Sequence, residues 1–129
     1  MSEITGIGID LEEIERIASM LDRWGRTFAE KVFSDAEISY CDRKHHPAQH
    51  YAARFAAKEA FAKALGTGWR GHFRWKDIEV LNDADGKPDL YLRNDAQTLS
   101  PNTRIVLSLA HTKTHVVAVV VFQREQPDV

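Results

Sequence analysis

Cysteine, long apolar runs and excess charge are all scarce in this sequence. Its 129 residues include one cysteine, Cys41, which excludes an internal disulfide and suggests a reducing compartment such as the cytoplasm. No stretch approaches the roughly 20 apolar residues of a membrane-spanning helix, and residues 1–10 lack the basic and apolar segments of a signal peptide. Lys and Arg number 17 against 19 Asp and Glu, which disfavours a binder of duplex nucleic acid, because such a protein needs a concentrated basic surface.

The composition is that of a globular protein. Hydrophobic residues make up 43% of the chain and charged residues 28%, which excludes a disordered protein. A chain of this length can bury a core without metal or disulfide support. No repeat, low-complexity tract or linker interrupts it. We therefore expect one domain over residues 1–129, with no membrane contact.

Hydrophobic periodicity predicts a mainly helical first half. Residues 4–9 are β-branched and interrupted by glycine, as in a short strand. Apolar residues recur every three or four positions from Leu11 to Trp24, which predicts an amphipathic helix with Asp10 at its N-cap position. Three further helices are expected, over residues 27–33, 34–43 and 48–65. The helix over 48–65 is alanine-rich and apolar nearly all round, as in a buried central helix.

The second half is predicted to be β-rich. Residues 75–82 and 89–93 flank a turn that contains Gly86, and residues 104–110 and 115–123 flank a second short turn. Strands joined by such turns form antiparallel sheets. The expected class is α+β, with an antiparallel sheet packed on a long central helix.

Two acidic residues stand in unusual positions. Glu59 lies among alanine and phenylalanine on the central helix, where a carboxylate should be paired, metal-bound or shifted in pKa. Lys63, four residues later, could pair with it, so an ordinary surface ion pair is one interpretation. Asp10 follows Gly6 and Gly8 at the end of a strand, where a simple N-cap is the alternative. Together the two carboxylates suit Mg²⁺, which is usually held by one or two carboxylates and substrate phosphates.

Other cofactor motifs are incomplete. The Gly6-x-Gly8 pair lacks the third glycine of a dinucleotide-binding loop. The histidines at 45, 46 and 50 have no cysteines beside them, and the pair at 111 and 115 falls in a β segment. A zinc site is therefore not expected, and Cys41 is interpreted as a packed thiol.

Four segments together resemble a known family. They are GIGIDL near the N-terminus, ARFAAKEAFAKALGTG at 53–68, Asn82 to Pro88 ending in Gly-Lys-Pro, and SLAHT at 108–112. In this order and spacing they closely resemble the bacterial-type holo-acyl-carrier-protein synthases, the small branch of the 4′-phosphopantetheinyl transferases. The most specific part is the Lys58-Glu59-x-x-x-Lys63 core.

The resemblance implies an activity. Enzymes of this family move phosphopantetheine from coenzyme A to a serine of acyl carrier protein, release adenosine 3′,5′-bisphosphate and use Mg²⁺, in fatty acid biosynthesis. Asp10 and Glu59 are then the expected metal ligands, and Lys63 neutralises phosphate or assists the leaving group. Either Glu59 or a metal-bound water takes the serine proton, and the residues leave both open. The serine belongs to the partner, so this chain needs no nucleophile of its own.

The resemblance also implies sites for the coenzyme and the carrier. The expected coenzyme contacts are Arg54, Gly66, Thr67, Pro88, His111 and Thr112. Arg16, Met20 and Arg23 form a stripe on the first predicted helix that suits an acidic carrier-protein helix. A plain solvated helix face is the alternative, because acidic residues are interspersed along the same helix.

Members of this branch are typically homotrimers with active sites at subunit interfaces. By resemblance, Asp10 and His111 are expected from one subunit, and Glu59 and Arg54 from its neighbour. Two departures, Ala62 and Ala110, stand where relatives often carry hydroxyl groups, so coenzyme affinity is expected to differ. The histidines at 45 and 46 replace frequent basic residues, which puts phosphate contacts by that loop in doubt. The alternatives are a domain acting on a megasynthase carrier and a non-catalytic binding module.

Overall fold

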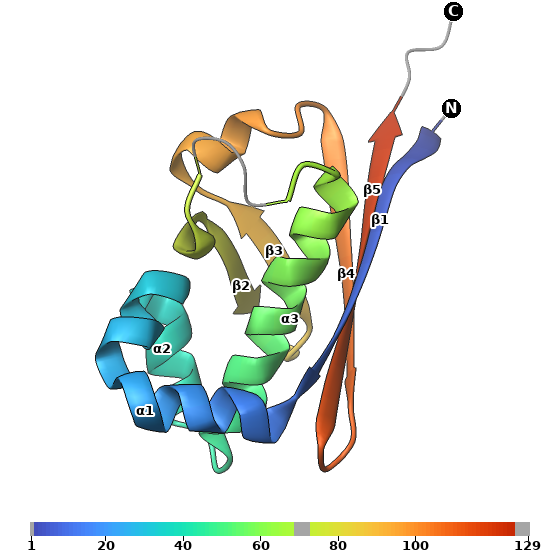
Figure 1. Cartoon of the computed structure of the whole chain (residues 1–129). Coiled ribbons are helices and arrows are strands. Elements are labelled where there is room, and N and C mark those ends of the chain that lie inside the picture. The colour runs from blue at the N-terminus through green and yellow to red at the C-terminus, as the bar shows by residue number, and fades with distance from the viewer. Residues whose placement is uncertain (1, 69–72, 126–129) are drawn as a thin grey trace, which may run out of the picture.

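A three-stranded antiparallel sheet forms one side of the molecule. The structure, a computed structural model, describes residues 2–68 and 73–125. The sheet contains β1 (Ser2–Glu13), β5 (His115–Glu125) and β4 (Thr103–His111), in that spatial order (Figure 1). A smaller antiparallel sheet pairs β2 (Ile78–Asn82) with β3 (Pro88–Leu92).

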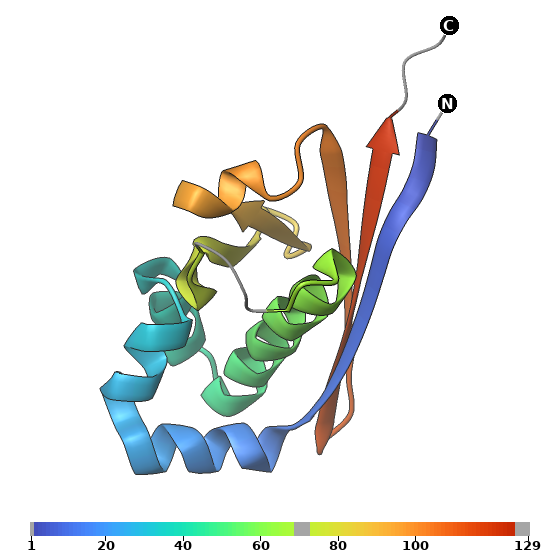
Figure 2. The same ribbon diagram turned by 45° about the horizontal axis from the view of Figure 1, so that its top comes forward.

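Helix α3 (Pro47–Leu65) lies across the inner face of the large sheet. It packs against β1 and β5 on one side, and it contacts α1 (Ile14–Val32), α2 (Asp35–Asp42) and β2 on the other. Figure 2 shows α3 between the large sheet and the remaining elements. Short 3₁₀ turns cover Trp75–Asp77 and Asn94–Thr98. Among the described residues no helix has the length and apolar character needed to span a bilayer.

Strand β1 contacts α3 backbone to backbone, because both elements carry small residues. A Cβ atom on Gly6 would lie 2.5 Å from the carbonyl oxygen of Ala64. A Cβ on Gly8 would lie 2.7 Å from the amide nitrogen of Ala64, and closer still to the Ala60 carbonyl. Such distances leave no room for a side chain. Glycine is required here for close approach.

The side chains of β1 alternate in an unusual way. Gly8, Asp10 and Glu12 point inward and are buried, whereas Ile9 and Leu11 are exposed. Alternation follows from the two-residue period of a strand. The small and acidic residues of β1 therefore face α3, and its large apolar residues face outward.

The start of the first helix differs from the sequence-based expectation. The strand continues to Glu13, which pairs with His115, and α1 begins only at Ile14. Asp10 pairs with Ala118 inside the sheet, so it is not a helix N-cap. The helical periodicity from Leu11 to Glu13 was misleading. Backbone pairing with β5 continues up to His115, the first residue of β5, and keeps these three residues in the strand.

The other predicted elements are largely confirmed. The two helical segments expected before residue 34 form one element, α1, which is kinked at Gly25 where φ is 54°. The predicted capping box of α2 is present, with Ser34 and Glu37 exchanging hydrogen bonds. The strand expected from Trp75 begins at Ile78 instead, because a 3₁₀ turn precedes it.

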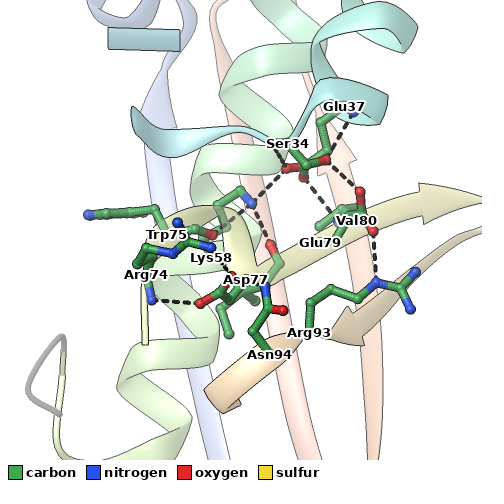
Figure 3. A network of polar contacts seen from close by, with 11 residues as sticks. Ser34, Glu37, Lys58, Arg74, Trp75, Asp77, Glu79, Val80, Arg93 and Asn94 are labelled. Atoms are coloured by element: carbon green, nitrogen blue, oxygen red, sulfur yellow. Dashed lines mark hydrogen bonds and ion pairs between the residues drawn. The ribbon is translucent and has the colours of Figure 1, made fainter. Parts of the chain in front are cut away.

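A buried ion pair fastens the small sheet to the helices (Figure 3). Lys58 Nζ donates to Glu37 Oε1 at 2.8 Å, to the Trp75 carbonyl at 3.1 Å and to the Ile78 carbonyl. Glu37 Oε2 accepts the amide of Val80 at 3.0 Å. Both Lys58 and Glu37 are fully buried, and burial lowers the pKa of Lys58 while Glu37 opposes that shift. One lysine of α3 thus fixes the start of β2.

A second carboxylate extends this network. Glu79 accepts hydrogen bonds from the Ser34 hydroxyl and from Arg93 Nε, the latter at 2.9 Å. Asp77 accepts from Asn94 at 2.9 Å and from Arg74 (Figure 3). The small sheet is therefore held by charged contacts at its base.

Removing the buried cation tests the strength of this attachment. We expect Lys58→Met to lower the free energy of unfolding by about 3–5 kcal/mol, because it leaves the Glu37 carboxylate buried without its partner. Arg26→Met is the matched control, since Arg26 pairs with Glu30 on the surface and should change stability by less than about 1 kcal/mol. Urea unfolding measures both, and equal losses in the two variants would contradict the account.

Candidate active site

Asp10 and Lys63 meet where β1 crosses α3. Lys63 Nζ lies 3.1 Å from Oδ1 of Asp10 and 3.1 Å from the carbonyl of Ile9. Asp10 is 8% exposed, whereas the Lys63 side chain is 55% exposed. The contact joins residues 53 positions apart in the chain. The lysine that sequence spacing assigns to Glu59 thus contacts Asp10.

Glu12 is a third acidic residue at this place, and sequence analysis missed it. Burial raises the pKa of Glu12 to about 7, helped by the Asp10 carboxyl group beside it and the charge of Glu59. Arg16 Nη1 donates to Glu12 Oε2 at 2.8 Å and opposes the shift. The carboxyl groups of Asp10, Glu12 and Glu59 therefore lie near one another. If the predicted strand had continued to Glu13, the alternation of its side chains would have placed Asp10 and Glu12 on the same face.

The carboxylates fit a hard divalent cation. Oδ2 of Asp10 is buried, and within the described ranges it has no hydrogen-bond partner. An unused buried carboxylate oxygen beside other acids is the environment that a metal ion neutralises. No group of three or more His, Cys, Asp or Glu among residues 2–68 and 73–125 forms a ready-made metal site. The chain would thus supply Asp10 and Glu59 as two ligands, as is usual for Mg²⁺, which keeps water and binds substrate phosphates.

A second, basic cluster surrounds Arg54. Arg54 is 3% exposed, and its Nη2 donates to Asn82 Oδ1 at 2.7 Å. Its guanidinium lies 4.2 Å from the ring centroid of Tyr40. The pKa of His50 is lowered by burial first and then by the positive charges of Arg54, Lys44 and others. The cluster therefore combines several cationic groups in one place.

His111 belongs to the same region. Its Nε2 lies 3.2 Å from Nε2 of Gln49 on α3, and its charge also lowers the pKa of His50. His111 ends β4, and Thr112 follows in the turn before β5, with its amide donating to the His115 carbonyl. Both His111 and Thr112 are exposed.

The remaining expected coenzyme contacts lie just after the end of α3 and at the start of β3. Gly66 terminates α3 with φ of 85°, and Thr67 follows it on the surface. Pro88 begins β3 and pairs with Asn82 of β2. Asn82 in turn accepts the hydrogen bond from Arg54. The sequence indicates Asn82 only as the first residue of the segment from Asn82 to Pro88, with no contact of its own. Its contact with Arg54 comes from the packing of β2 against α3 and was not foreseeable from spacing.

The expected division of these residues between subunits stays a prediction, because the structure describes a single chain. Asp10 lies with Lys63 and near Glu59 in the same chain, whereas His111 lies near Arg54. At about 100° per residue, Arg54 and Glu59 point roughly 140° apart around α3. One chain therefore carries an acidic cluster and a basic cluster on different sides of the same helix.

The expected docking stripe is partly engaged. Arg16 is paired with Glu12, and its guanidinium lies 6.0 Å from the ring centroid of Phe55. Arg23 is exposed and lies 5.2 Å from the ring centroid of Trp24. Met20, which lies between the two arginines in the sequence, is half-buried. The stripe begins beside the acidic cluster and extends away from it along α1.

The comparison with known proteins agrees with this arrangement. A family model described as the 4′-phosphopantetheinyl transferase superfamily matches residues 6–120, which include both clusters. The chain belongs to this family. The enzyme class expected from the motifs, a phosphopantetheinyl transferase, is thereby confirmed, as is the α+β class with an antiparallel sheet.

Individual relatives match nearly end to end. The holo-[acyl-carrier-protein] synthase of Geobacter sp. (strain M21) is 46% identical over 124 residues, covering 94% of this chain and 99% of the relative. The crystal structure of the synthase from Neisseria meningitidis has 35% identity and a TM-score of 0.84, covering 93% of this chain and 98% of that one. The synthase from Bacillus anthracis, solved in complex with coenzyme A (3′,5′-ADP), has 37% identity and a TM-score of 0.79, covering 95% and 98%.

Filling the space at Gly8 tests whether close packing positions the acidic cluster. We expect Gly8→Ala to lower the free energy of unfolding by about 1–3 kcal/mol, because the added methyl group pushes β1 away from α3. Thr5→Ala, at an exposed position of the same strand, is the control and should change stability by less than about 0.5 kcal/mol. Urea unfolding at fixed protein concentration provides the comparison. A Gly8→Ala protein as stable as its parent would show that the contact is not tight.

Proposed function

We propose that the chain transfers 4′-phosphopantetheine from coenzyme A to a serine of apo-acyl carrier protein, releases adenosine 3′,5′-bisphosphate, depends on Mg²⁺ and serves fatty acid biosynthesis. The observation that carries this proposal is the buried Asp10 carboxylate, with one oxygen on Lys63 and the other without a partner in the described chain. Glu59 lies in the same acidic cluster. The coenzyme bound to the Bacillus anthracis relative supports the choice of donor.

The proposed reaction is an in-line displacement at phosphorus. The serine oxygen of the carrier bonds to the phosphorus next to pantetheine, and the bond from that phosphorus to the bridging oxygen breaks. Adenosine 3′,5′-bisphosphate leaves, and the hydroxyl proton passes to Glu59 or to water. Mg²⁺ held by Asp10 and Glu59 would neutralise charge on the diphosphate. Lys63, whose side chain is 55% exposed and contacts Asp10, would bind the departing phosphate.

The basic cluster suits the nucleotide end of the donor. Arg54 and His111 would contact its phosphates, since charge-assisted hydrogen bonds from such groups are strong. The turn at Gly66 and Thr67 would approach the diphosphate, where glycine lets the backbone come close. Pro88 and Thr112 would border the adenine region. Asn82 fixes Arg54 in this assignment.

The carrier would dock along α1. Arg23 presents exposed positive charge and Met20 a half-buried apolar side chain. Arg16 stands at the end of the stripe nearest the acidic cluster, bonded to Glu12. An acidic carrier helix on this stripe would therefore have its modified serine close to Asp10.

We further propose a homotrimer whose active sites lie at subunit interfaces, in the cytoplasm. The outer face of the large sheet supports self-association. By strand register, three rows cross β1, β5 and β4. The rows are Ile7–Val121–Val106, Ile9–Val119–Ser108 and Leu11–Val117–Ala110. Eight of these nine side chains are apolar, and an exposed patch of this kind marks an interface. The separate acidic and basic clusters support completion of each site by a neighbour.

Replacing Glu59 tests the metal assignment. We expect Glu59→Gln to lose at least about a hundredfold in transfer rate and to remain folded, because an amide is a poor ligand for Mg²⁺. Glu30→Gln, on the exposed side of α1, is the control and should transfer normally. Mass spectrometry of apo-carrier protein with coenzyme A and Mg²⁺ reports the gain of one phosphopantetheine group. Normal transfer by Glu59→Gln would exclude Glu59 from the mechanism, and a parent that binds coenzyme without transfer would be a binding module.

Adding charge to the outer sheet face tests the assembly. We expect the parent to have the mass of a trimer by light scattering and Ile9→Glu to be a folded monomer, because the new carboxylate would be buried in the interface. Ala36→Glu adds the same charge to the exposed surface of α2 and should remain trimeric. A parent that is monomeric at micromolar concentration would contradict the proposal.

A further inference from the structure

One ion pair connects the exposed side of α1 with the buried acidic cluster. Arg16, in the first turn of α1, donates from Nη1 to Glu12 Oε2 at 2.8 Å. The Arg16 side chain is 57% exposed, whereas that of Glu12 is 11% exposed. The guanidinium also lies 6.0 Å from the ring centroid of Phe55 on α3. Arg16 is therefore accessible from solvent, while its partner lies inside the site.

Glu12 lies next to the proposed metal ligands. It follows Asp10 by two positions on β1, and the two-residue period of a strand turns both side chains inward. The charges of Asp10 and Glu59 both act on Glu12. Asp10 is 8% exposed, and within the described part of the chain its Oδ2 has no hydrogen-bond partner. A buried carboxylate oxygen without a partner is unfavourable, so it favours a cation beside it.

Each of these two carboxylates of β1 has its own cation. Lys63 of α3 contacts Asp10, and Arg16 of α1 contacts Glu12. Glu12 need not be a direct ligand for its charge to matter, because a carboxylate attracts a divalent ion over several ångström where water is scarce. Arg16 opposes that attraction with its own positive charge. The affinity of the cluster for a cation therefore depends on how far Arg16 neutralises Glu12.

We propose that Glu12 strengthens divalent-cation binding at Asp10, and that Arg16 limits this effect until an acidic partner binds Arg16. The inference rests on the proposed function, because it takes a metal ion at Asp10 and an acidic carrier on α1. Anionic groups of the carrier would share the exposed guanidinium, which has further N–H donors besides the one given to Glu12. Carrier docking and metal binding then strengthen each other by the same factor.

Calorimetric titration with Mn²⁺ alone tests the ion pair, without coenzyme, carrier or transfer. We expect Arg16→Met to bind Mn²⁺ at least about threefold more tightly than the parent, because Glu12 loses its cation. Glu12→Gln should bind Mn²⁺ at least about threefold more weakly. In the double variant, Arg16→Met should add less than about 1.5-fold, because an exposed charge without Glu12 is screened by solvent. Titration at about pH 8 keeps Glu12 charged, since its pKa is raised to about 7.

Arg26→Met is the matched control. Arg26 forms an ion pair with Glu30, ten residues further along α1, so the variant removes the same charge and breaks the same kind of contact. Its Mn²⁺ affinity should equal that of the parent. Equal tightening in Arg16→Met and Arg26→Met would overturn the role of the ion pair, as would additive effects of Arg16→Met and Glu12→Gln. Because Arg16 is mostly exposed, Arg16→Met tests the proposal even if Glu12→Gln does not fold.

The link to the partner is tested with apo-acyl carrier protein. Its Kd for the parent, measured by fluorescence anisotropy, should fall at least about threefold at saturating Mn²⁺, because the coupling is reciprocal. With Glu12→Gln the carrier should gain less than about 1.5-fold from Mn²⁺. Equal gains with the parent and with Glu12→Gln would overturn the link, because Mn²⁺ would then act without Glu12.

Failure of this inference and failure of the proposed function give different results. A parent that transfers phosphopantetheine but binds Mn²⁺ as tightly as Arg16→Met does would refute the inference alone. A chain that shows the expected changes in Mn²⁺ affinity but transfers nothing would refute the proposed function alone. A parent that binds no Mn²⁺ would refute both.

Discussion

Backbone contact between β1 and α3 is the constraint on which the site depends. Gly6 and Gly8 leave no side chain between the strand and the helix, and Ala60 and Ala64 offer equally small surfaces. The next inward position after Gly8 is Asp10, so close packing brings its carboxylate within reach of Lys63. A larger residue at either glycine would increase the distance between β1 and α3. The same alternation turns the large apolar residues of β1 outward, which links the acidic cluster to the surface proposed for assembly.

Helix α3 connects the two halves of the chemistry. Its side facing β1 carries Glu59 and Lys63, and another side carries Arg54 and Lys58. Lys58 fixes the start of β2, and Arg54 contacts Asn82 at the end of that strand. The small sheet is thus held at both ends by one face of α3. The attachment of β2 to α3 fixes the position of Arg54 and Asn82 in the basic cluster. The position of Asp10 in the acidic cluster is fixed by the large sheet.

Much of this could be predicted from the sequence, and the failures have physical causes. The hairpins, α2 with its capping box and the alanine-rich helix all follow from local patterns, and the motif around Glu59 indicated the family. Glu12 was missed because three residues of strand were interpreted as helix, which hid its alternation with Asp10. The position of Asn82 beside Arg54 depends on tertiary packing. Local periodicity contains none of these long-range contacts.

The most direct test of the central claim is a crystal structure with coenzyme A and Mn²⁺, which replaces Mg²⁺ and gives an anomalous signal. The account predicts an anomalous peak within about 2.3 Å of carboxylate oxygens of both Asp10 and Glu59 of one chain, with diphosphate oxygens completing the coordination. A peak that contacts neither carboxylate, or that contacts the two residues only from different subunits, would contradict it.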